Sequence, residues 1–163
     1  MAEAEALVDL QMAASVVALA HIFPQEAHPF PRDDVLGRWR AELADPDVAV
    51  LVSIDEAGVM TGFGARRHAE LLHFGTAPAT WGSGLASDLH DALLATWPSG
   101  TGRLRLRVFR DNHRARRFWE KHGWDPTGES TRSPFEPRPV LLTYECRRGS
   151  RWGGGEGRET VSG

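Results

Sequence analysis

Two glycines, Gly82 and Gly84, stand between an apolar segment and a segment with helical periodicity. Residues 71–76 are short and apolar, which favours a strand, and large apolar residues then recur every fourth position at Leu85, Leu89, Leu93 and Trp97. The first N–H groups of a helix lack intrahelical partners and carry partial positive charge. Because glycine tolerates positive φ and close approach, this turn predicts a phosphate site, although two glycines alone fit an ordinary tight turn equally well.

A second stretch, residues 112–124, follows about thirty positions later in the chain and favours another helix. Asn112 is a good N-cap, and Gly123 is the residue type expected just after a helix end. The apolar and aromatic residues of the stretch share one face of this helix, whereas its basic residues lie mostly on the other.

Together the two stretches resemble the GNAT superfamily of acyl-CoA-dependent N-acyltransferases. Its first motif reads roughly V-x-P-x-x-Q/R-x-x-G-x-G/A, and Thr76 to Gly84 follow that spacing. Its second reads roughly N-x-x-A-x-x-F-Y-x-x-x-G-F, which Asn112 to Trp124 follow. The resemblance covers about residues 5–146. It implies acetyl-CoA as co-substrate and transfer of its acetyl group to a primary amine of a small molecule or a protein.

The resemblance also implies which residues bind the cofactor. The strand before the first motif, at Phe74, Gly75 and Thr76, would pair by its backbone with the pantetheine arm, and Asn112 would hydrogen-bond the same arm. Phe118 would pack beside the cofactor. The pyrophosphate would be held by the backbone N–H groups of Trp81, Gly82, Ser83, Gly84, Leu85 and Ala86.

Acyl transfer to an amine needs a base, and the candidates are His73, Glu70 and Glu26. Two of these residues also have a non-catalytic interpretation. His73 fits a half-buried strand histidine held by a neighbour, and Glu26 fits a solvated loop residue. Trp119 occupies the position where many family members carry a tyrosine proposed to protonate the thiolate. Since an indole has no acid chemistry at neutral pH, we expect Trp119 to line the site by packing.

Two alternatives to an enzyme remain open. A non-catalytic GNAT-like module that binds acyl-CoA or a partner is favoured by Trp119, and by Ala79 at the position we assign to the motif's glutamine or arginine. Nucleic-acid binding is the weaker alternative, because the net charge is −3 and no readout motif accompanies the basic cluster. That cluster comprises Arg103, Arg105, Arg107, Arg110, Arg114, Arg116 and Arg117. We expect most of it to be a solvated face balanced by acidic residues elsewhere, whereas one or two members could meet the 3′-phosphate of CoA.

Composition and length suit one ordinary globular domain, with 41% hydrophobic and 25% charged residues in 163. We expect a GNAT-like domain over residues 1–146 and a disordered tail rich in glycine and arginine over 147–163. A single cysteine, Cys146, suits a reducing cytoplasm. We expect no metal, no membrane segment and no nucleic-acid partner, and the sequence leaves a homodimer open.

The expected fold class is α+β, with a mixed, mostly antiparallel sheet flanked by helices. Helices are predicted over residues 3–20, about 34–43, 84–97 and 112–122. Strands are predicted over 48–54, 59–66, 70–76, 103–109, 124–129 and 140–146. No strand precedes the first helix, so the strand that usually opens a GNAT domain is missing. In the resembling family, the loop at residues 23–31 forms part of the acceptor-side wall.

Overall fold

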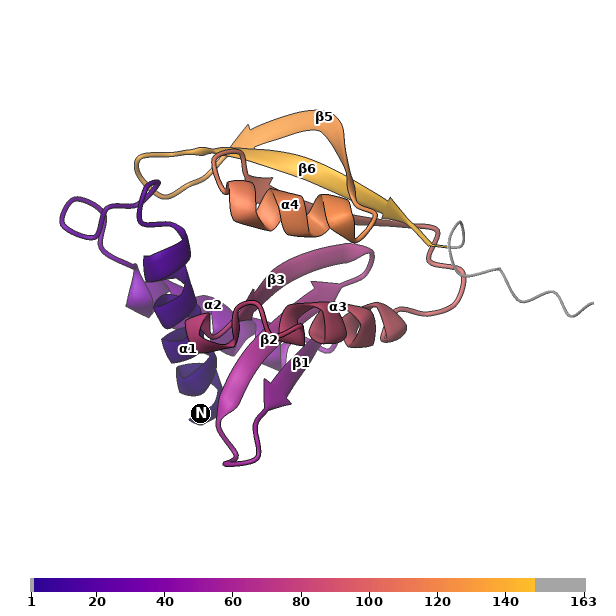
Figure 1. The fold of residues 1–163 in the computed structure, drawn as a ribbon, viewed down its shortest axis with the longest axis horizontal. Helices are drawn as coiled ribbons and strands as arrows, with labels where there is room; N and C mark the ends of the chain where they lie inside the picture. Colours follow the sequence, from indigo (N-terminus) through magenta and orange to yellow (C-terminus); the bar gives the residue numbers. More distant parts are fainter. Residues whose placement is uncertain (1, 149–163) are drawn as a thin grey trace, which may run out of the picture.

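The computed structural model describes residues 2–148 and confirms the predicted α+β class. Four helices and one short 3₁₀ turn accompany a six-stranded sheet of order β1-β2-β3-β4-β6-β5, in which only β3 and β4 run parallel (Figure 1). The first described element is the helix α1, with no strand before it in the described chain. The helices are α1 (Ala2–Ala18), α2 (Arg32–Ala44), α3 (Leu85–Ala95) and α4 (His113–Lys121), with η1 at Pro78–Thr80. The strands are β1 (Val48–Ile54), β2 (Met60–Arg67), β3 (Glu70–Thr76), β4 (Arg103–Phe109), β5 (Asp125–Arg132) and β6 (Val140–Arg147).

The helices cover both faces of the sheet and bury a separate apolar cluster on each. On one face α1 and α2 pack Leu7, Val8 and Trp39 against Phe63 of β2. On the other, Leu93 of α3 and Trp119 of α4 belong to a cluster with strand residues such as Leu104 and Leu106. Burying a side chain of this size stabilises the fold by roughly 1.5–3 kcal/mol. The two clusters fix the sheet between helical layers.

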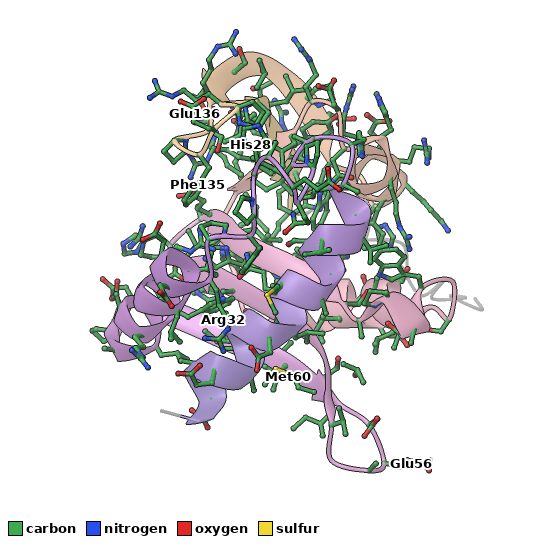
Figure 2. All side chains as sticks on the ribbon, turned by 90° about the vertical axis from the view of Figure 1, so that its left-hand side faces the viewer. His28, Arg32, Glu56, Met60, Phe135 and Glu136 are labelled. Carbon is green, nitrogen blue, oxygen red and sulfur yellow. The ribbon has the colours of Figure 1, made fainter. Side chains whose placement is uncertain are left out.

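Close contacts fix the two helical layers in position. Arg32 at the start of α2 contacts Glu5 at 2.9 Å and Asp9 at 2.8 Å, which ties α2 to α1 (Figure 2). On the opposite face α3 lies against β2, where a Cβ on Gly64 would come within 2.8 Å of Leu93 Cδ2. A larger residue at position 64 would therefore force the Leu93 side chain to move.

Strands β3 and β4 pair over only two positions and then diverge. Glu70 pairs with Arg105 and Leu71 with Leu106, after which the edge of β3 that faces β4 has no strand partner among the described residues. The divergence coincides with a bulge in β3, because Ala65 of β2 pairs with His73 whereas Arg66 pairs with Leu71. A bulge adds one residue and breaks the alternation of side chains. Leu72 packs against the α1–α2 cluster and Phe74 against the α3–α4 cluster.

The described structure continues beyond the predicted C-terminal boundary of the domain. β6 includes Arg147, and the Arg148 side chain donates hydrogen bonds to the carbonyl oxygens of Trp97 at 2.7 Å and Pro98 at 3.0 Å. The tail predicted to begin at 147 therefore begins at least two residues too early. The rest of that prediction, residues 149–163, lies outside the described residues. Strand β5 likewise runs to Arg132 and not to 129.

Candidate active site

A cavity of about 590 Å³, here called the first cavity, lies where β3 and β4 diverge. Its walls come from these two strands, the C-terminal half of α1, the turn before α3 and one side of α4. Eleven of the residues predicted for the site line it, although they come from four separate parts of the chain. They are His73, Phe74, Gly75, Thr76, Trp81, Gly82, Gly84, Ala86, Asn112, Phe118 and Trp119.

The turn before α3 has the backbone geometry that its glycines predict. Gly82 has φ 82° and Gly84 φ 92°, and α3 begins at Leu85. A Cβ on either glycine would meet no atom within 4 Å, so within the described chain the requirement for glycine comes from the positive φ. The space above the turn is open to a ligand. Ser83 and Leu85 of the same turn do not line the cavity. The Ser83 hydroxyl donates to the carbonyl oxygen of Thr80 at 2.6 Å.

Trp81 and Arg114 form a contact between the turn and α4. The Arg114 guanidinium lies over the Trp81 ring, 3.6 Å from its centroid, and the indole Nε1–H donates to the Thr76 carbonyl oxygen at 3.2 Å. Assigning the polar residue of the first motif to Ala79 is wrong, because counting the motif from Thr76 places that residue at Trp81. The positive charge that an arginine of the motif would supply comes here from Arg114 of α4, which lines the cavity.

Asn112 caps α4 as predicted, since its Oδ1 accepts a hydrogen bond from the Ala115 N–H at 3.2 Å. Its side-chain nitrogen has no partner in the described part of the chain. This NH₂ group is therefore free to donate to a ligand in the first cavity, which Asn112 lines.

Trp119 is held by packing. Its side chain is 6% exposed, and its ring lies 5.2 Å from Phe74 and 5.7 Å from Trp124. No hydrogen bond from its indole nitrogen occurs within residues 2–148. Tyr144 cannot replace the missing tyrosine, because it is buried between Arg116 and Glu120 and lines neither this cavity nor the second one.

A second cavity, of about 580 Å³, lies between α2, the loop at 23–31 and the loop that joins β5 to β6. Figure 2 shows His28 from the first loop beside Phe135 and Glu136 from the other, and all three line this cavity. The family resemblance predicts the first of these loops as an acceptor-side wall. The two cavities share Gln11, Ser15, Leu19, Leu71, Leu72, His73, Arg107, Phe109 and Leu141, so they meet along one strip of wall.

His73 lies in this shared wall and contacts Glu42 of α2. Its Nε2 is 2.8 Å and 2.9 Å from the two Glu42 carboxylate oxygens, and its ring centroid is 4.7 Å from that of Trp39. A carboxylate only accepts hydrogen bonds, so Nε2 carries the proton and Nδ1 is the imidazole's acceptor. Burial lowers the pKa of His73 below its usual 6.5, which outweighs the opposing effect of Glu42. His73 is therefore neutral at neutral pH.

The other two predicted bases lie in different surroundings. Glu70 lines the second cavity, where its carboxylate is 3.7 Å from the Arg107 guanidinium. Glu26 is exposed and lines neither cavity. Glu42 was not predicted, because it lies 31 residues before His73 and on a different element. Neither the residue type of Glu42 nor its neighbours in the sequence indicate a contact with a distant histidine.

Within residues 2–148, no cluster of three or more His, Cys, Asp or Glu side chains is placed to bind a metal ion. None of the described helices has both the length and the apolar character needed to cross a bilayer.

The chain belongs to the acetyltransferase (GNAT) family, whose sequence model matches residues 13–124. Solved structures with this fold include the PaiA N-acetyltransferase from Thermoplasma acidophilum in complex with coenzyme A, which is 18% identical with a TM-score of 0.66 over 89% of this chain and 92% of that one. The apo form of YjaB from Escherichia coli is 24% identical, with a TM-score of 0.66 over 88% and 90%. A GCN5-related N-acetyltransferase from Rhodopseudomonas palustris is 17% identical, with a TM-score of 0.69 over 90% and 91%. No curated protein matches the chain.

Proposed function

We propose that this protein transfers the acetyl group of acetyl-CoA to a primary amine of a small molecule or a protein. The observation that carries the proposal is the strip of wall, including His73, where the two cavities meet. One cavity has the features of a CoA site and the other is large enough for an acceptor. A neutral histidine at their junction is suited to accept a proton from the amine.

The residues of the first cavity fit acetyl-CoA. The N-terminus of α3 and the open space over Gly82 and Gly84 suit a pyrophosphate, to which Arg114 adds positive charge. The unpaired edge of β3 at Phe74–Thr76 offers backbone groups to the amides of the pantetheine arm, and Asn112 offers a side-chain amide. Phe118 lines the same wall.

Acetyl-CoA supplies an activated thioester, so the protein's tasks are positioning and proton transfer. His73 Nδ1 accepts the proton of the acceptor's ammonium group, directly or through a water molecule, and Glu42 holds the imidazole in the required tautomer. A backbone N–H of the β3 edge polarises the thioester carbonyl. Trp119 does not act as an acid. A thiol such as that of cysteine has a pKa of about 8.5, close enough to neutral pH for the thiolate to leave without a proton from the protein.

The proposal is tested by measuring binding and turnover on the same protein. Thermal unfolding with CoA and acetyl-CoA reports occupancy, and release of free thiol from acetyl-CoA over a panel of amines reports transfer. We expect both ligands to raise the melting temperature, and at least one amine to accelerate thiol release far above hydrolysis. No stabilisation by either ligand would contradict the CoA site itself.

A non-catalytic acyl-CoA-binding module is the second candidate, and Trp119 favours it because it stands where the family's acid tyrosine is usual. The same experiment separates the two. Stabilisation by acetyl-CoA, with no amine in the panel increasing thiol release, would support the module and refute the transferase.

A further inference from the structure

Arg38 of α2 lines the second cavity in an unusual state. Its Nε atom is buried without a hydrogen-bond partner, and no hydrogen bond or ion pair to its guanidinium is found among the described residues. Burial lowers its pKa, while Glu42 one turn later opposes that effect. Both carboxylate oxygens of Glu42 already lie within 2.9 Å of His73 Nε2. Arg38 is thus a partly buried cation whose hydrogen-bonding groups find no partner among residues 2–148.

The other charged groups of the second cavity have partners. Glu70 lies 3.7 Å from Arg107, and Glu136 lies 2.9 Å from Arg138. The cavity wall therefore offers an unpaired cation but, within residues 2–148, no unpaired carboxylate. An acceptor rich in positive charge, such as a polyamine, would meet Arg38 and find no free anion there. An acceptor with a carboxylate would supply the partner that Arg38 lacks.

We propose that the acceptor is a small amine that also carries a carboxylate, an amino acid or a close relative, and that Arg38 binds this carboxylate. The planar guanidinium fork matches a carboxylate in shape and charge. Arg38 and His73 line the same cavity, so the carboxylate end is held at α2 while the amine end reaches the junction with the first cavity. This inference rests on the proposed transferase function and names its substrate class.

The test compares matched acceptors on the full-length protein: the standard α-amino acids and their carboxamides, which keep the amine and lose the negative charge. We expect wild-type kcat/KM to favour the best amino acid over its carboxamide by roughly tenfold to a hundredfold, the factor typical of a hydrogen bond to a charged group. Arg38→Met should abolish the preference by raising KM for the amino acid. It should leave KM for the carboxamide within about twofold.

Two controls separate binding from folding. Arg40→Met alters an exposed arginine on the same helix, which pairs with Glu5 outside both cavities, and should leave the preference unchanged. Arg38→Met should not lower the melting temperature, because it removes an unsatisfied buried donor; a structural role for Arg38 predicts the opposite. Equal loss of activity on amino acids and carboxamides, or a wild-type preference for carboxamides or polyamines, would overturn the proposal.

A second measurement keeps the inference testable if no amine is acetylated. Thermal unfolding in the presence of CoA and N-acetyl amino acids reports carboxylate binding without turnover. Stabilisation of wild type but not of Arg38→Met would support the carboxylate site even if the transferase proposal failed. No stabilisation of wild type by any N-acetyl amino acid, and no turnover of any amino acid, would overturn it.

Discussion

At the scale of single residues, the central feature is the contact between His73 and Glu42. Burial of the imidazole and its hydrogen bond to a carboxylate have opposite effects on the pKa of His73, and burial is the larger. Because its pKa lies below 6.5, the protonated form appears only under acidic conditions. The neutral form is also the one that can accept a proton from an amine.

The first prediction is the pH dependence that follows from this state. His73 stays neutral around pH 7, so its ionisation should not change turnover at saturating acetyl-CoA in that range. Turnover should fall as the pH drops through the lowered pKa of His73, below about 6.5. The contribution of His73 to stability has the same sign: it is present above pH 6.5 and is lost as pH falls through the folded-state pKa. A pH–rate profile of thiol release tests this. Turnover that rises as the medium is acidified would contradict it.

The second prediction concerns Trp119, which is packed among aromatic rings and donates no hydrogen bond among the described residues. Trp119→Phe should keep most activity, because an apolar ring remains in the wall. Trp119→Ala should destabilise the protein by roughly 3–5 kcal/mol. Trp119→Tyr should preserve or raise turnover. A folded Trp119→Phe protein without activity would show that the indole N–H itself is needed.

Local signals explain which site residues the sequence could predict. The turn at Gly82 and Gly84 and the cap at Asn112 depend on neighbours within a few positions, so their geometry follows from residue type. The partnership of His73 with Glu42 spans 31 residues, and the stacking of Arg114 on Trp81 joins a loop to a separate helix. Such contacts depend on how elements pack, which no local pattern encodes.

At the scale of elements, the bulge in β3 and the start of α3 shape the first cavity. The bulge at Leu72 coincides with the end of pairing between β3 and β4, so a backbone edge stays free. The short, apolar character of residues 71–76 predicted a strand but gave no sign of the extra residue. The turn into α3 then brings helix N–H groups to the end of that free edge.

The third prediction tests this turn. Gly84→Val should leave the protein folded but greatly weaken CoA binding, because a β-branched residue is strained at φ 92° and fills the open space over the turn. Gly100→Val is the matched control: Gly100 has φ 99°, no neighbour within 4 Å of a Cβ, and no place in either cavity. Isothermal titration with CoA should separate the two variants. Equal affinities in both would remove the turn from the site.

At the scale of the whole molecule, the sheet divides where β3 and β4 diverge, and the two cavities meet beside that division. Figure 1 shows α4, β5 and β6 on one side of it and β1, β2 and α3 on the other. The order of elements could be predicted from apolar periodicity and from the family resemblance. The junction of the cavities could not be predicted, because its wall comes from α1, β3, β4 and β6, and local sequence patterns do not show how these elements pack together.

The fourth prediction concerns the end of β6. A chain that ends at Arg148 should be more stable than one that ends at Cys146, by about 1–3 kcal/mol, because the shorter chain loses the hydrogen bonds of Arg148 to the loop after α3. Thermal unfolding of the two truncated proteins measures the difference. Identical melting temperatures would show that these contacts contribute nothing in solution.

The most direct test of acetyl transfer at the junction of the two cavities is thiol release from acetyl-CoA by His73→Gln, measured with the best amine of the panel. We predict that this variant loses roughly 10²–10⁴-fold in kcat, the range for removal of a general base, while CoA raises its melting temperature as in wild type. The exposed His113→Gln should match wild type in both measurements. A His73→Gln protein that binds CoA and turns over at the wild-type rate would contradict the assignment of acetyl transfer to the junction of the two cavities.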